Sequence, residues 1–349
     1  MVGSDGEVGR AGDPPFFPGR SVRGRSPQLR TRAKMRDYIQ LREAMEHKDR
    51  GLREKVMSLK EAIGLIRDGD VVAAGGCHYS RTPMAAVWEI IRQRKKGLVY
   101  CRSITSTEGD LLLVAEACAH FVTSWFSPGV TWGVSRVMRH YMQEKLAVFE
   151  EWSHMSLGLR FRAGAMGIPF IPARVMLGSD LFPRVPMKEM ECPYTGEKLA
   201  LVPALNPDVA ILHAQKCDPY GNVQGEGLPF MDNDIALAAD KVIVTAERII
   251  SNDQVRRNPD RTTIPFFCVD AVVEVPYGCL PHECYGQYEP DFAHMDYYVK
   301  LMMDKGPDGV KEYLDKYVYA PESWNDYLEM LGFKQILRAT VSGRGVYND

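Results

Sequence analysis

Long apolar runs, an excess of one charge and internal repeats are all missing from this sequence of 349 residues. No apolar stretch reaches the length of a membrane span, and no secretory signal is visible. Lys and Arg number 43 against 45 Asp and Glu, so the net charge of −2 gives no general attraction to nucleic acid or anionic lipid. We therefore expect a globular protein with neither a nucleic-acid nor a membrane partner.

A disulfide-rich composition is missing too, because only eight cysteines are spread along the chain. Cys118 and Cys268 lie inside apolar runs, which favours buried thiols in a reducing cytoplasm. Residues 1–34 hold many Gly, Pro and Arg and few large aliphatic residues. We expect these residues to form a disordered extension ahead of a natural start at Met35, followed by one domain over residues 35–349.

Strand-like apolar runs alternate with helix-like segments from residue 57 onward. A capping box of Ser58 and Glu61 predicts the first helix. The later expected helices are 83–96, 109–118, 134–145, 154–166 and 232–239, and the expected strands are 71–74, 98–104, 121–126, 198–205, 208–215, 241–247 and 268–276. Residues 211–224 predict a hairpin, and the tail from residue 291 predicts helices that end in a short strand at 336–341. The alternation predicts an α/β fold with an open, mostly parallel sheet and helices on both faces.

The stretch "VVAAGGCHYSRTPMAAVWEIIRQRKKG", residues 71–97, carries the first candidate site. An apolar strand runs into Gly75 and Gly76, which permit unusual backbone angles and leave no Cβ between the chain and a ligand. Thr82 is a candidate helix cap, and Pro83 suits the first helical turn. The junction either binds a ligand through free N–H groups or is simply a tight strand-to-helix crossing.

Other polar loops are expected at the same edge of the sheet, because open parallel sheets bind ligands beyond the carboxyl ends of their strands. These loops are 75–82, 105–110, 127–133, 178–184 and 213–227. Their candidate residues are Ser80, Arg81, Glu108, Ser127, Gly178, Ser179, His213, Gln215 and Glu226. No recognisable catalytic triad is present among them.

Several longer stretches resemble class I CoA-transferases, and within that family the A (α) subunit of glutaconate CoA-transferase. They include "GGCHYSRTPMAAVWEIIRQ", "GIPFIPARVMLGSDL", "DVAILHAQKCDPYGNVQ" and "CYGQYEPD". The resemblance runs from about Met57 to Val346 and implies an open α/β fold whose two similar halves face each other across a CoA thioester. It implies CoA or acyl contacts for Gly75, Gly76, His78, Ser80, Arg81, Gly178, Ser179, His213 and Gln215. The thioester is then a substrate, and no permanently bound cofactor is expected.

The family chemistry uses a glutamate carboxylate that attacks an acyl-CoA and passes through an anhydride to a glutamyl-CoA thioester. In two-subunit members that glutamate belongs to the B subunit, so the resemblance implies a B-type partner and a chain that lacks the nucleophile. Glu108, followed by Gly109 after a strand, is the one local candidate for a catalytic carboxylate. It is also explained as an acidic residue at the start of a helix.

Two alternatives stay open. A related branch of the family contains subunits of a CoA-dependent ring-cleaving hydrolase, and His154 occupies the position of its catalytic glutamate, so His154 is either a base or a helix-start residue. In "CLPHEC", Cys279, His282, Glu283 and Cys284 lie close together, but no second cluster has zinc-like spacing. We therefore expect no metal site.

Overall fold

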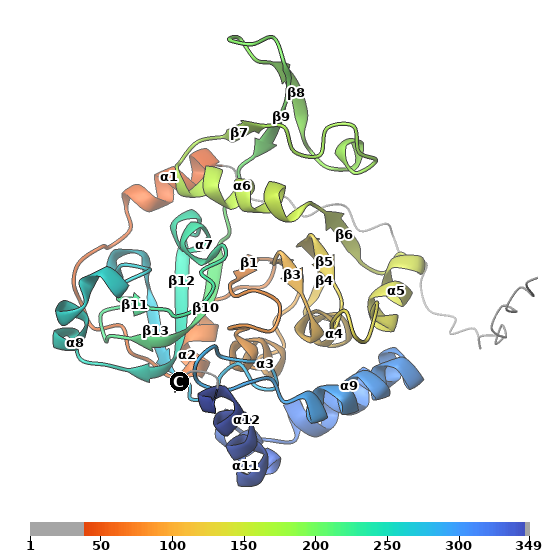
Figure 1. The fold of residues 1–349 in the computed structure, drawn as a ribbon, viewed down its shortest axis with the longest axis vertical. Helices are drawn as coiled ribbons and strands as arrows, with labels where there is room; N and C mark the ends of the chain where they lie inside the picture. The colour runs from red at the N-terminus through yellow and green to blue at the C-terminus, as the bar shows by residue number, and fades with distance from the viewer. Residues whose placement is uncertain (1–37, 346–349) are drawn as a thin grey trace, which may run out of the picture.

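The computed structural model describes residues 38–345 of the chain (Figure 1). The prediction for residues 1–34 lies outside this range. Within the described part, none of the helices combines the length and the apolar character that a membrane crossing requires.

The core of the molecule is a sheet of seven parallel strands, in the order β13-β12-β10-β1-β2-β4-β6, with β11 pairing antiparallel to β10. The strands are β1 (Val71–Ala74), β2 (Leu98–Cys101), β4 (Cys118–Thr123), β6 (Val148–Glu151), β10 (Val209–Cys217), β11 (Val223–Gln224), β12 (Lys241–Ile249) and β13 (Ala271–Glu274). The chain builds outward from β1 through β2, β4 and β6, and later adds β10, β12 and β13 on the other side of β1. The topological switch point therefore lies between β1 and β10, where open α/β sheets place their ligands.

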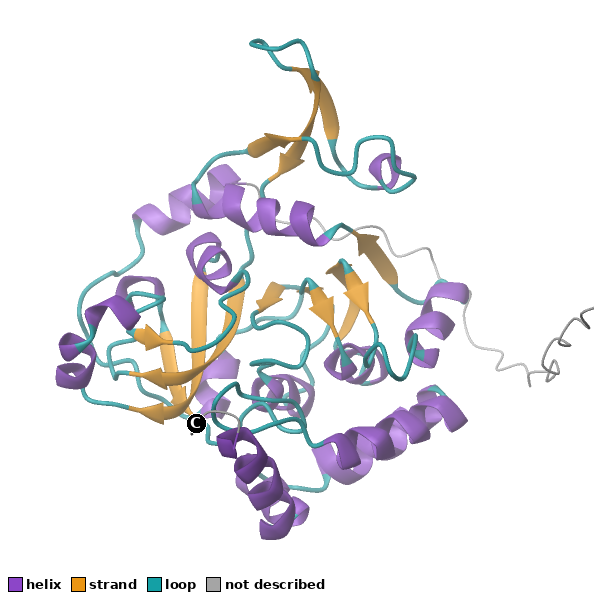
Figure 2. Cartoon of the chain, in the orientation of Figure 1, coloured by secondary structure: helices purple, strands orange, loops and turns teal. Residues whose placement is uncertain are grey.

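Helices cover both faces of this sheet (Figure 2), as the sequence predicts. Val72 and Ala74 of β1 pack into one apolar cluster, and Val71 and Ala73 pack into the other. The first face is covered by α2 (Leu59–Gly64), α3 (Met84–Arg92), α4 (Thr107–Val114) and α5 (Arg136–Gln143). The second face is covered by α6 (His154–Ala165) and α7 (Asp232–Ala238). Because both faces are buried, β1 and β2 at the centre of the sheet are apolar throughout instead of alternating.

Several predicted ends of helices and strands are confirmed, and others lie a few residues from their predicted positions. The structure reproduces strand 71–74 and the capping box of Ser58 and Glu61. The predicted helix 109–118 is α4, which ends at Val114, because the chain enters β4 at Cys118 to pair with Leu98. The remaining short elements are α1 (Tyr38–Glu46), β3 (Ile104–Thr105), β5 (Trp125–Phe126), α8 (Asn252–Arg257), three 3-10 turns (Phe182–Arg184, Pro259–Arg261, Phe266–Cys268) and a π-helical turn (Asp315–Tyr319).

The C-terminal tail forms helices that pack against the helices covering the first face of the sheet. They are α9 (Phe292–Lys305), α10 (Pro307–Leu314), α11 (Trp324–Leu331) and α12 (Phe333–Gly345). The predicted strand at 336–341 is wrong, since this segment lies inside α12. Ile336 and Ala339, three positions apart, both pack against the body of the protein, and the Thr340 hydroxyl donates to the Ile336 carbonyl at 2.9 Å. This helical spacing of contacts outweighs the β-branched composition of the segment.

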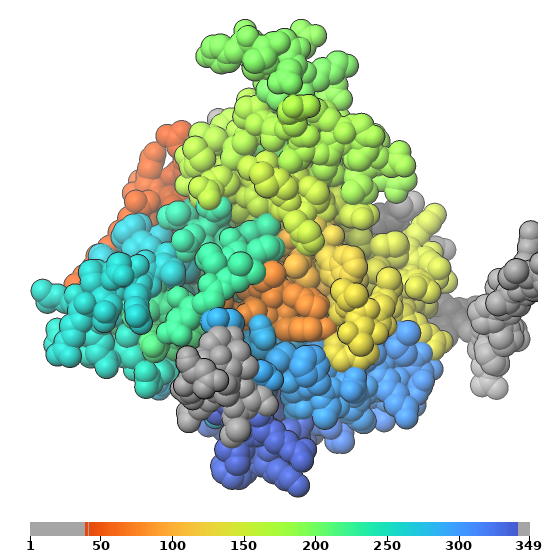
Figure 3. All heavy atoms as spheres, viewed as in Figure 1, coloured from red at the N-terminus to blue at the C-terminus, as the bar shows by residue number. Residues whose placement is uncertain are grey.

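An antiparallel arm projects from the second face, after α6 (Figures 1 and 3). Its strands are β7 (Phe170–Ala173), β8 (Lys188–Glu191) and β9 (Lys198–Pro203), in the order β7-β9-β8. Only the β9 segment is predicted from the sequence. Most side chains of β7 and β8 are exposed, so these strands carry no buried apolar pattern that would reveal them.

Candidate functional site

The loop 75–82 follows β1 at the switch point and has a strained backbone. The φ angles are 74° at Gly76, 53° at His78 and 57° at Arg81, all in the left-handed region that non-glycine residues rarely adopt. The Cys77 N–H donates to the Ser80 carbonyl at 2.9 Å, and the Ser80 N–H donates back to the Cys77 carbonyl at 2.8 Å. His78 and Tyr79 thus form the tip of a tight turn. Strain of this kind persists where the surroundings enforce it, and it gathers at functional sites.

Gly75 is required by close packing against β10 and α7, and Gly76 by the close approach of the Ser80 carbonyl within the loop. A Cβ on Gly75 would lie 2.5 Å from Leu212 Cδ2 and 2.8 Å from Asp232 Oδ1. The Gly76 N–H donates to Asp232 Oδ1 at 2.8 Å, and the other oxygen of Asp232 pairs with the buried Arg81 guanidinium. Gly75, Gly76 and Arg81 therefore anchor the loop to Asp232. Their predicted contacts with CoA stay a prediction.

A buried ion pair supports the loop from below. Arg102 and Glu108 are 1% and 0% exposed, and Arg102 Nη1 lies 2.5 Å from Glu108 Oε1. The same guanidinium donates to the Gly75 carbonyl at 3.1 Å and to the His78 carbonyl at 2.9 Å. Glu108 also accepts from the Ser106 N–H at 3.0 Å. Glu108 is therefore enclosed, and one of its oxygens is held by two donors.

Thr82 does not cap α3 as predicted. Its hydroxyl donates to the His78 carbonyl at 2.8 Å and accepts from Arg102 Nη2 at 3.0 Å, while Pro83 occupies the cap position. Both hydrogen bonds of the Thr82 hydroxyl therefore hold the strained loop in place above the ion pair. The helix start is instead tied by the Ala85 N–H, which donates to the Gly278 carbonyl at 2.9 Å.

The tip of the loop presents unpaired donors and a neutral histidine. Among the described residues, no acceptor pairs with the backbone N–H of His78 or Tyr79. Burial, reinforced by the Arg102 charge, lowers the pKa of His78 to about 4, so its ring is uncharged at neutral pH. Successive free N–H groups in such a turn can hold an anion or a polarised oxygen. The ligand-binding interpretation of the glycine-pair junction stays a prediction.

His213 and Gln215 lie on β10, next to the switch point, and both are 1% exposed. Gln215 is saturated by backbone groups, since its amide donates to the Tyr285 carbonyl at 2.9 Å and its oxygen accepts from the Glu226 N–H at 2.9 Å. His213 Nε2 lies 2.8 Å from Glu247 Oε1. Burial alone would lower the pKa of His213, but contacts with Cys284 and Glu247 raise it to about 9.

A cavity of about 170 Å³ opens beside these residues. Arg81, His213 and Asp232 form its polar wall, and Leu212, Val223 and Ile264 form its apolar wall. Its size is below the 300–1,000 Å³ of pockets that enclose whole drug-sized ligands, so it suits only a small group of a larger ligand.

Gly178 and Ser179 are exposed and lie in the arm, in the segment between β7 and β8. The Ser179 hydroxyl donates to the Met176 carbonyl at 2.7 Å, within the same segment. The Ser156 hydroxyl, in the first turn of α6, donates to Met176 Sδ at 3.0 Å, so this segment lies beside the start of α6. The structure does not bring these two residues together with the loop 75–82 in this chain.

His154 is exposed at the start of α6, as one of the two sequence interpretations predicts. Its Nδ1 lies 2.7 Å from the Ser124 hydroxyl and 2.9 Å from the Ser103 hydroxyl. Since the Ser124 hydroxyl donates to the Ser103 carbonyl at 2.7 Å, Ser124 accepts from a protonated Nδ1. Partial burial lowers the pKa of His154, and its Nε2 has no partner among the described residues. The ring can therefore act as a base through Nε2.

The structure adds four residues that the sequence analysis did not place at the site: Arg102, Tyr79, His282 and Glu247. The Tyr79 hydroxyl donates to the Pro128 carbonyl and joins the loop 75–82 to the loop 127–133. His282 is fully buried, and its Nε2 lies 2.9 Å from the Thr107 hydroxyl beside Glu108. Only Arg102 carried a usable signal, as a charged residue directly after an apolar strand.

Comparison with known proteins assigns the family. The family model for coenzyme A transferase matches residues 56–275, more than half of the chain. This chain belongs to the coenzyme A transferase family. The A subunit of glutaconate CoA-transferase from Acidaminococcus fermentans is 34% identical over 314 residues, covering 84% of this chain and 98% of the relative. The crystal structure of that enzyme superposes with a TM-score of 0.76 at 33% identity, covering 81% of this chain and 94% of the matched chain. The predicted A-subunit resemblance and α/β fold are therefore confirmed.

Two further relatives, one uncharacterised and one a hydrolase subunit, are also similar to this chain. An uncharacterised protein of Archaeoglobus fulgidus is 40% identical over 290 residues, covering 82% of this chain, which spans only 64% of that relative's length. The IpdA subunit of a cholesterol ring-cleaving hydrolase from Rhodococcus jostii is 29% identical over 271 residues, covering 69% of this chain and 86% of the relative. The hydrolase branch is thus similar to this chain, but less so than the glutaconate branch.

Proposed function

We propose that this chain is the A subunit of a heteromeric CoA-transferase, which moves CoA between an acyl-CoA and a carboxylic acid with a B-type partner. The observation that carries the proposal is the enclosure of Glu108. A covalent carboxylate must reach the thioester carbonyl, but Glu108 is buried beneath the loop 75–82 and paired with Arg102. The nucleophilic glutamate is accordingly assigned to the partner.

In this scheme the partner's carboxylate attacks the acyl-CoA carbonyl and expels CoA thiolate, leaving an acyl–glutamyl anhydride. The thiolate then attacks the glutamyl carbonyl and releases the first carboxylic acid, giving a glutamyl-CoA thioester. The incoming acid reverses both steps. This chain contributes the wall of the site: the free N–H groups of His78 and Tyr79 are the candidate donors to the oxyanion, and the adjoining cavity is the candidate acyl pocket.

The coenzyme is a consumed substrate in this proposal, and no permanently bound organic cofactor is needed. We also assign the complex to the cytoplasm. The support is that all eight cysteines are free in the structure, and six of them are buried.

The test is acyl exchange between CoA thioesters and carboxylic acids, measured with this chain alone, with a B-type partner alone, and with both. Only the mixture should show exchange. Robust exchange by the purified chain, with no second subunit detectable by mass spectrometry, would contradict the assignment of the nucleophile.

Hydrolysis of a CoA-linked ring remains the second candidate, favoured by the free Nε2 of His154. If His154 is the general base for water, His154→Ala should lower turnover of the reconstituted pair by roughly 10²–10⁴-fold. His140→Ala is the matched control, because His140 is also exposed and lies on the preceding helix, α5, on the other face of the sheet. A transferase should tolerate both changes with less than about a tenfold loss, in which case hydrolysis through His154 is excluded.

A further inference from the structure

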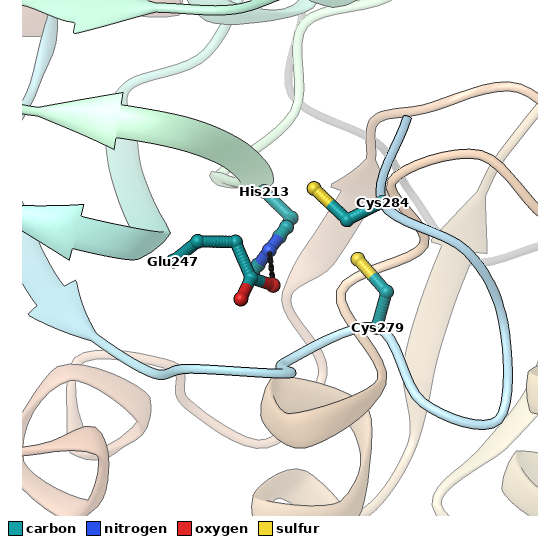
Figure 4. Close-up of side chains that lie close together, drawn as sticks. All are labelled: His213, Glu247, Cys279 and Cys284. Atoms are coloured by element: carbon teal, nitrogen blue, oxygen red, sulfur yellow. Dashed lines mark hydrogen bonds and ion pairs between the residues drawn. The ribbon is translucent and has the colours of Figure 1, made fainter. Parts of the chain in front are cut away.

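A second polar cluster lies beside the candidate site, and of its four residues only His213 also lines the candidate acyl pocket. His213 from β10, Glu247 from β12, and Cys279 and Cys284 from the loop after β13 point toward one another (Figure 4). Each offers one ligand atom, and these four atoms all lie within 4.8 Å of one another. Within residues 38–345 this is the one group of three or more potential ligands that meets this criterion.

The four ligand types match a known coordination chemistry. Thiolate, imidazole and carboxylate groups bind Zn²⁺ in tetrahedral sites, with bond lengths of about 2.3 Å to sulfur and about 2.0–2.2 Å to nitrogen and oxygen. These bond lengths place ligand atoms about 3.3–3.8 Å from one another. The observed cluster needs a contraction of at most about 1 Å on its longest edge, and a small expansion of the 2.8 Å contact between His213 and Glu247.

The surroundings orient the ligands as metal sites require. His213 Nδ1 lies 2.8 Å from the Thr245 hydroxyl, so this nitrogen can carry the proton and leave Nε2 free to coordinate. Glu247 accepts from the Tyr288 hydroxyl at 2.5 Å and from the Tyr277 N–H at 2.6 Å. A carboxylate fixed by such donors keeps its position when the His213 proton is replaced by a cation.

Burial of the ligands favours a closed, structural site. Cys279 and Cys284 are both 0% exposed, His213 is 1% exposed, and the side chain of Glu247 is 9% exposed. All four protein ligands are present, so no coordination position is left for a substrate. Gly278 allows the loop to approach, because a Cβ there would lie 2.7 Å from His213 Cε1.

The loop that carries both cysteines also supports the candidate site. The Arg81 N–H donates to the Glu283 carbonyl at 2.9 Å, and the Ala85 N–H donates to the Gly278 carbonyl at 2.9 Å. A cation that joins Cys279 and Cys284 to β10 and β12 would therefore fix one wall of the loop 75–82.

We propose that His213, Glu247, Cys279 and Cys284 bind one divalent transition-metal ion, with Zn²⁺ as the best match, as a structural site that fixes the loop 277–288. Binding releases the two thiol protons and the Nε2 proton of His213, and no redox step is involved. The sequence predicts no metal site at Cys279, His282, Glu283 and Cys284. In the structure His282 faces Thr107, and the Glu283 carbonyl accepts from the Arg81 N–H. Only the two cysteines of that set belong to the proposed site.

The test is the metal content of the full chain, purified without chelators both alone and with its partner. Elemental mass spectrometry should find about one zinc per chain, lost in Cys279→Ser and in Cys284→Ser. Cys217→Ser is the matched control, since Cys217 is also a buried thiol, at the end of the same strand as His213, and this variant should keep its metal.

Cobalt provides a readout that needs no variant. Wild-type chain stripped of metal, kept reduced and titrated with Co²⁺ should show an intense thiolate-to-cobalt absorption that saturates at one equivalent and is reversed by Zn²⁺. Removal of the metal should also lower the midpoint of thermal unfolding by several degrees. Less than about a tenth of an equivalent of any transition metal together with no cobalt spectrum would overturn the proposal. A Cys279–Cys284 disulfide in protein alkylated at once under non-reducing conditions would overturn it as well.

Discussion

Two buried polar clusters support neighbouring loops at the carboxyl edge of the sheet, and they are built differently. Arg102 and Glu108 are six residues apart in sequence and form a pair of one cation and one anion under the loop 75–82. The cluster of His213, Glu247, Cys279 and Cys284 joins three distant segments and holds the loop 277–288. In the first, the single negative charge is balanced by the single positive charge without any added ion. The second brings together two thiols, a carboxylate and an imidazole, a set of ligands suited to a transition metal.

The comparison shows that two loops at the same edge of the sheet can be held in place in two different ways. A buried ion pair adds little net stability but makes the loss of one partner costly, because the other charge is left unpaired in a dry site. A metal-binding cluster would make the stability of its loop depend on an external ion. Replacements in the first cluster should therefore lower stability directly, and replacements in the second should do so through loss of the metal ion.

Arg102→Ala is expected to have the largest effect. Removing the guanidinium leaves Glu108 buried without its partner and removes the donors to Gly75 and His78, which should cost about 3–5 kcal/mol in the free energy of unfolding. Urea unfolding followed by circular dichroism measures this loss. Arg102→Lys keeps the charge but cannot reproduce the fork, so an intermediate loss is expected. Wild-type stability in Arg102→Ala would show that the pair does not hold the loop.

Glu108→Gln should be milder. The change removes the countercharge of Arg102, but the neutral amide oxygen can still accept from Arg102 and from the Ser106 N–H, and Arg102 keeps its bonds to the Gly75 and His78 carbonyls. The expected cost is therefore about 1–3 kcal/mol, below that of Arg102→Ala. Turnover of the reconstituted pair should fall only modestly, since the residue positions the loop and is not the nucleophile. Complete inactivity of a folded Glu108→Gln pair that still binds CoA ester would instead place the reacting carboxylate on this chain.

Asp110, a buried carboxyl group near Glu108, should make the free energy of unfolding depend on pH. Burial raises the pKa of Asp110 from 3.8 to about 7, opposed by hydrogen bonds from Ser135 and Tyr298 and assisted by Glu108. The folded state therefore holds a proton that the unfolded state has lost, and the stability from this group falls as pH rises from about 4 to about 7. Asp110→Asn should remove a slope of up to about 1.4 kcal/mol per pH unit in unfolding measurements. Asp304→Asn, on the exposed side of α9, should leave the slope unchanged.

Deleting residues 1–34 should have the smallest effect. Their composition cannot bury enough apolar surface to offset the entropy of ordering, so neither cluster should depend on them. The thermal midpoint and turnover of a chain that starts at Met35 should match those of the full chain. Insoluble expression, or a midpoint lower by many degrees, would show that these residues are part of the domain.

The sequence predicts the sheet better than the sites. Strand 71–74 and the hairpin after Gln215 were recognisable because apolar runs and turn residues are local signals. The turn is held by Asp218, whose carboxylate accepts from the Tyr220 N–H at 3.0 Å and the Asn222 N–H at 2.8 Å. The arm strands β7 and β8 lacked such a signal, because they contribute few buried side chains.

The polar clusters depend on tertiary pairing, which a single sequence does not reveal. His213 pairs in register with Thr245, and this register places Glu247 two residues further along β12 beside the imidazole. The segment "CLPHEC" contains Cys279 and Cys284 of this cluster, but its spacing cannot reveal His213 and Glu247, which come from distant strands. The sequence identifies Glu108 as a candidate, but only the structure shows that it is buried and paired with Arg102.

The most direct test of the central claim is borohydride trapping of the covalent intermediate in the reconstituted pair, followed by peptide mass spectrometry. We expect a modified glutamate on the B-type partner, formed after acyl-CoA is added and still formed with Glu108→Gln and His154→Ala. A modified glutamate on this chain, or no trapped species together with an inactive His154→Ala pair that still binds CoA ester, would contradict the claim.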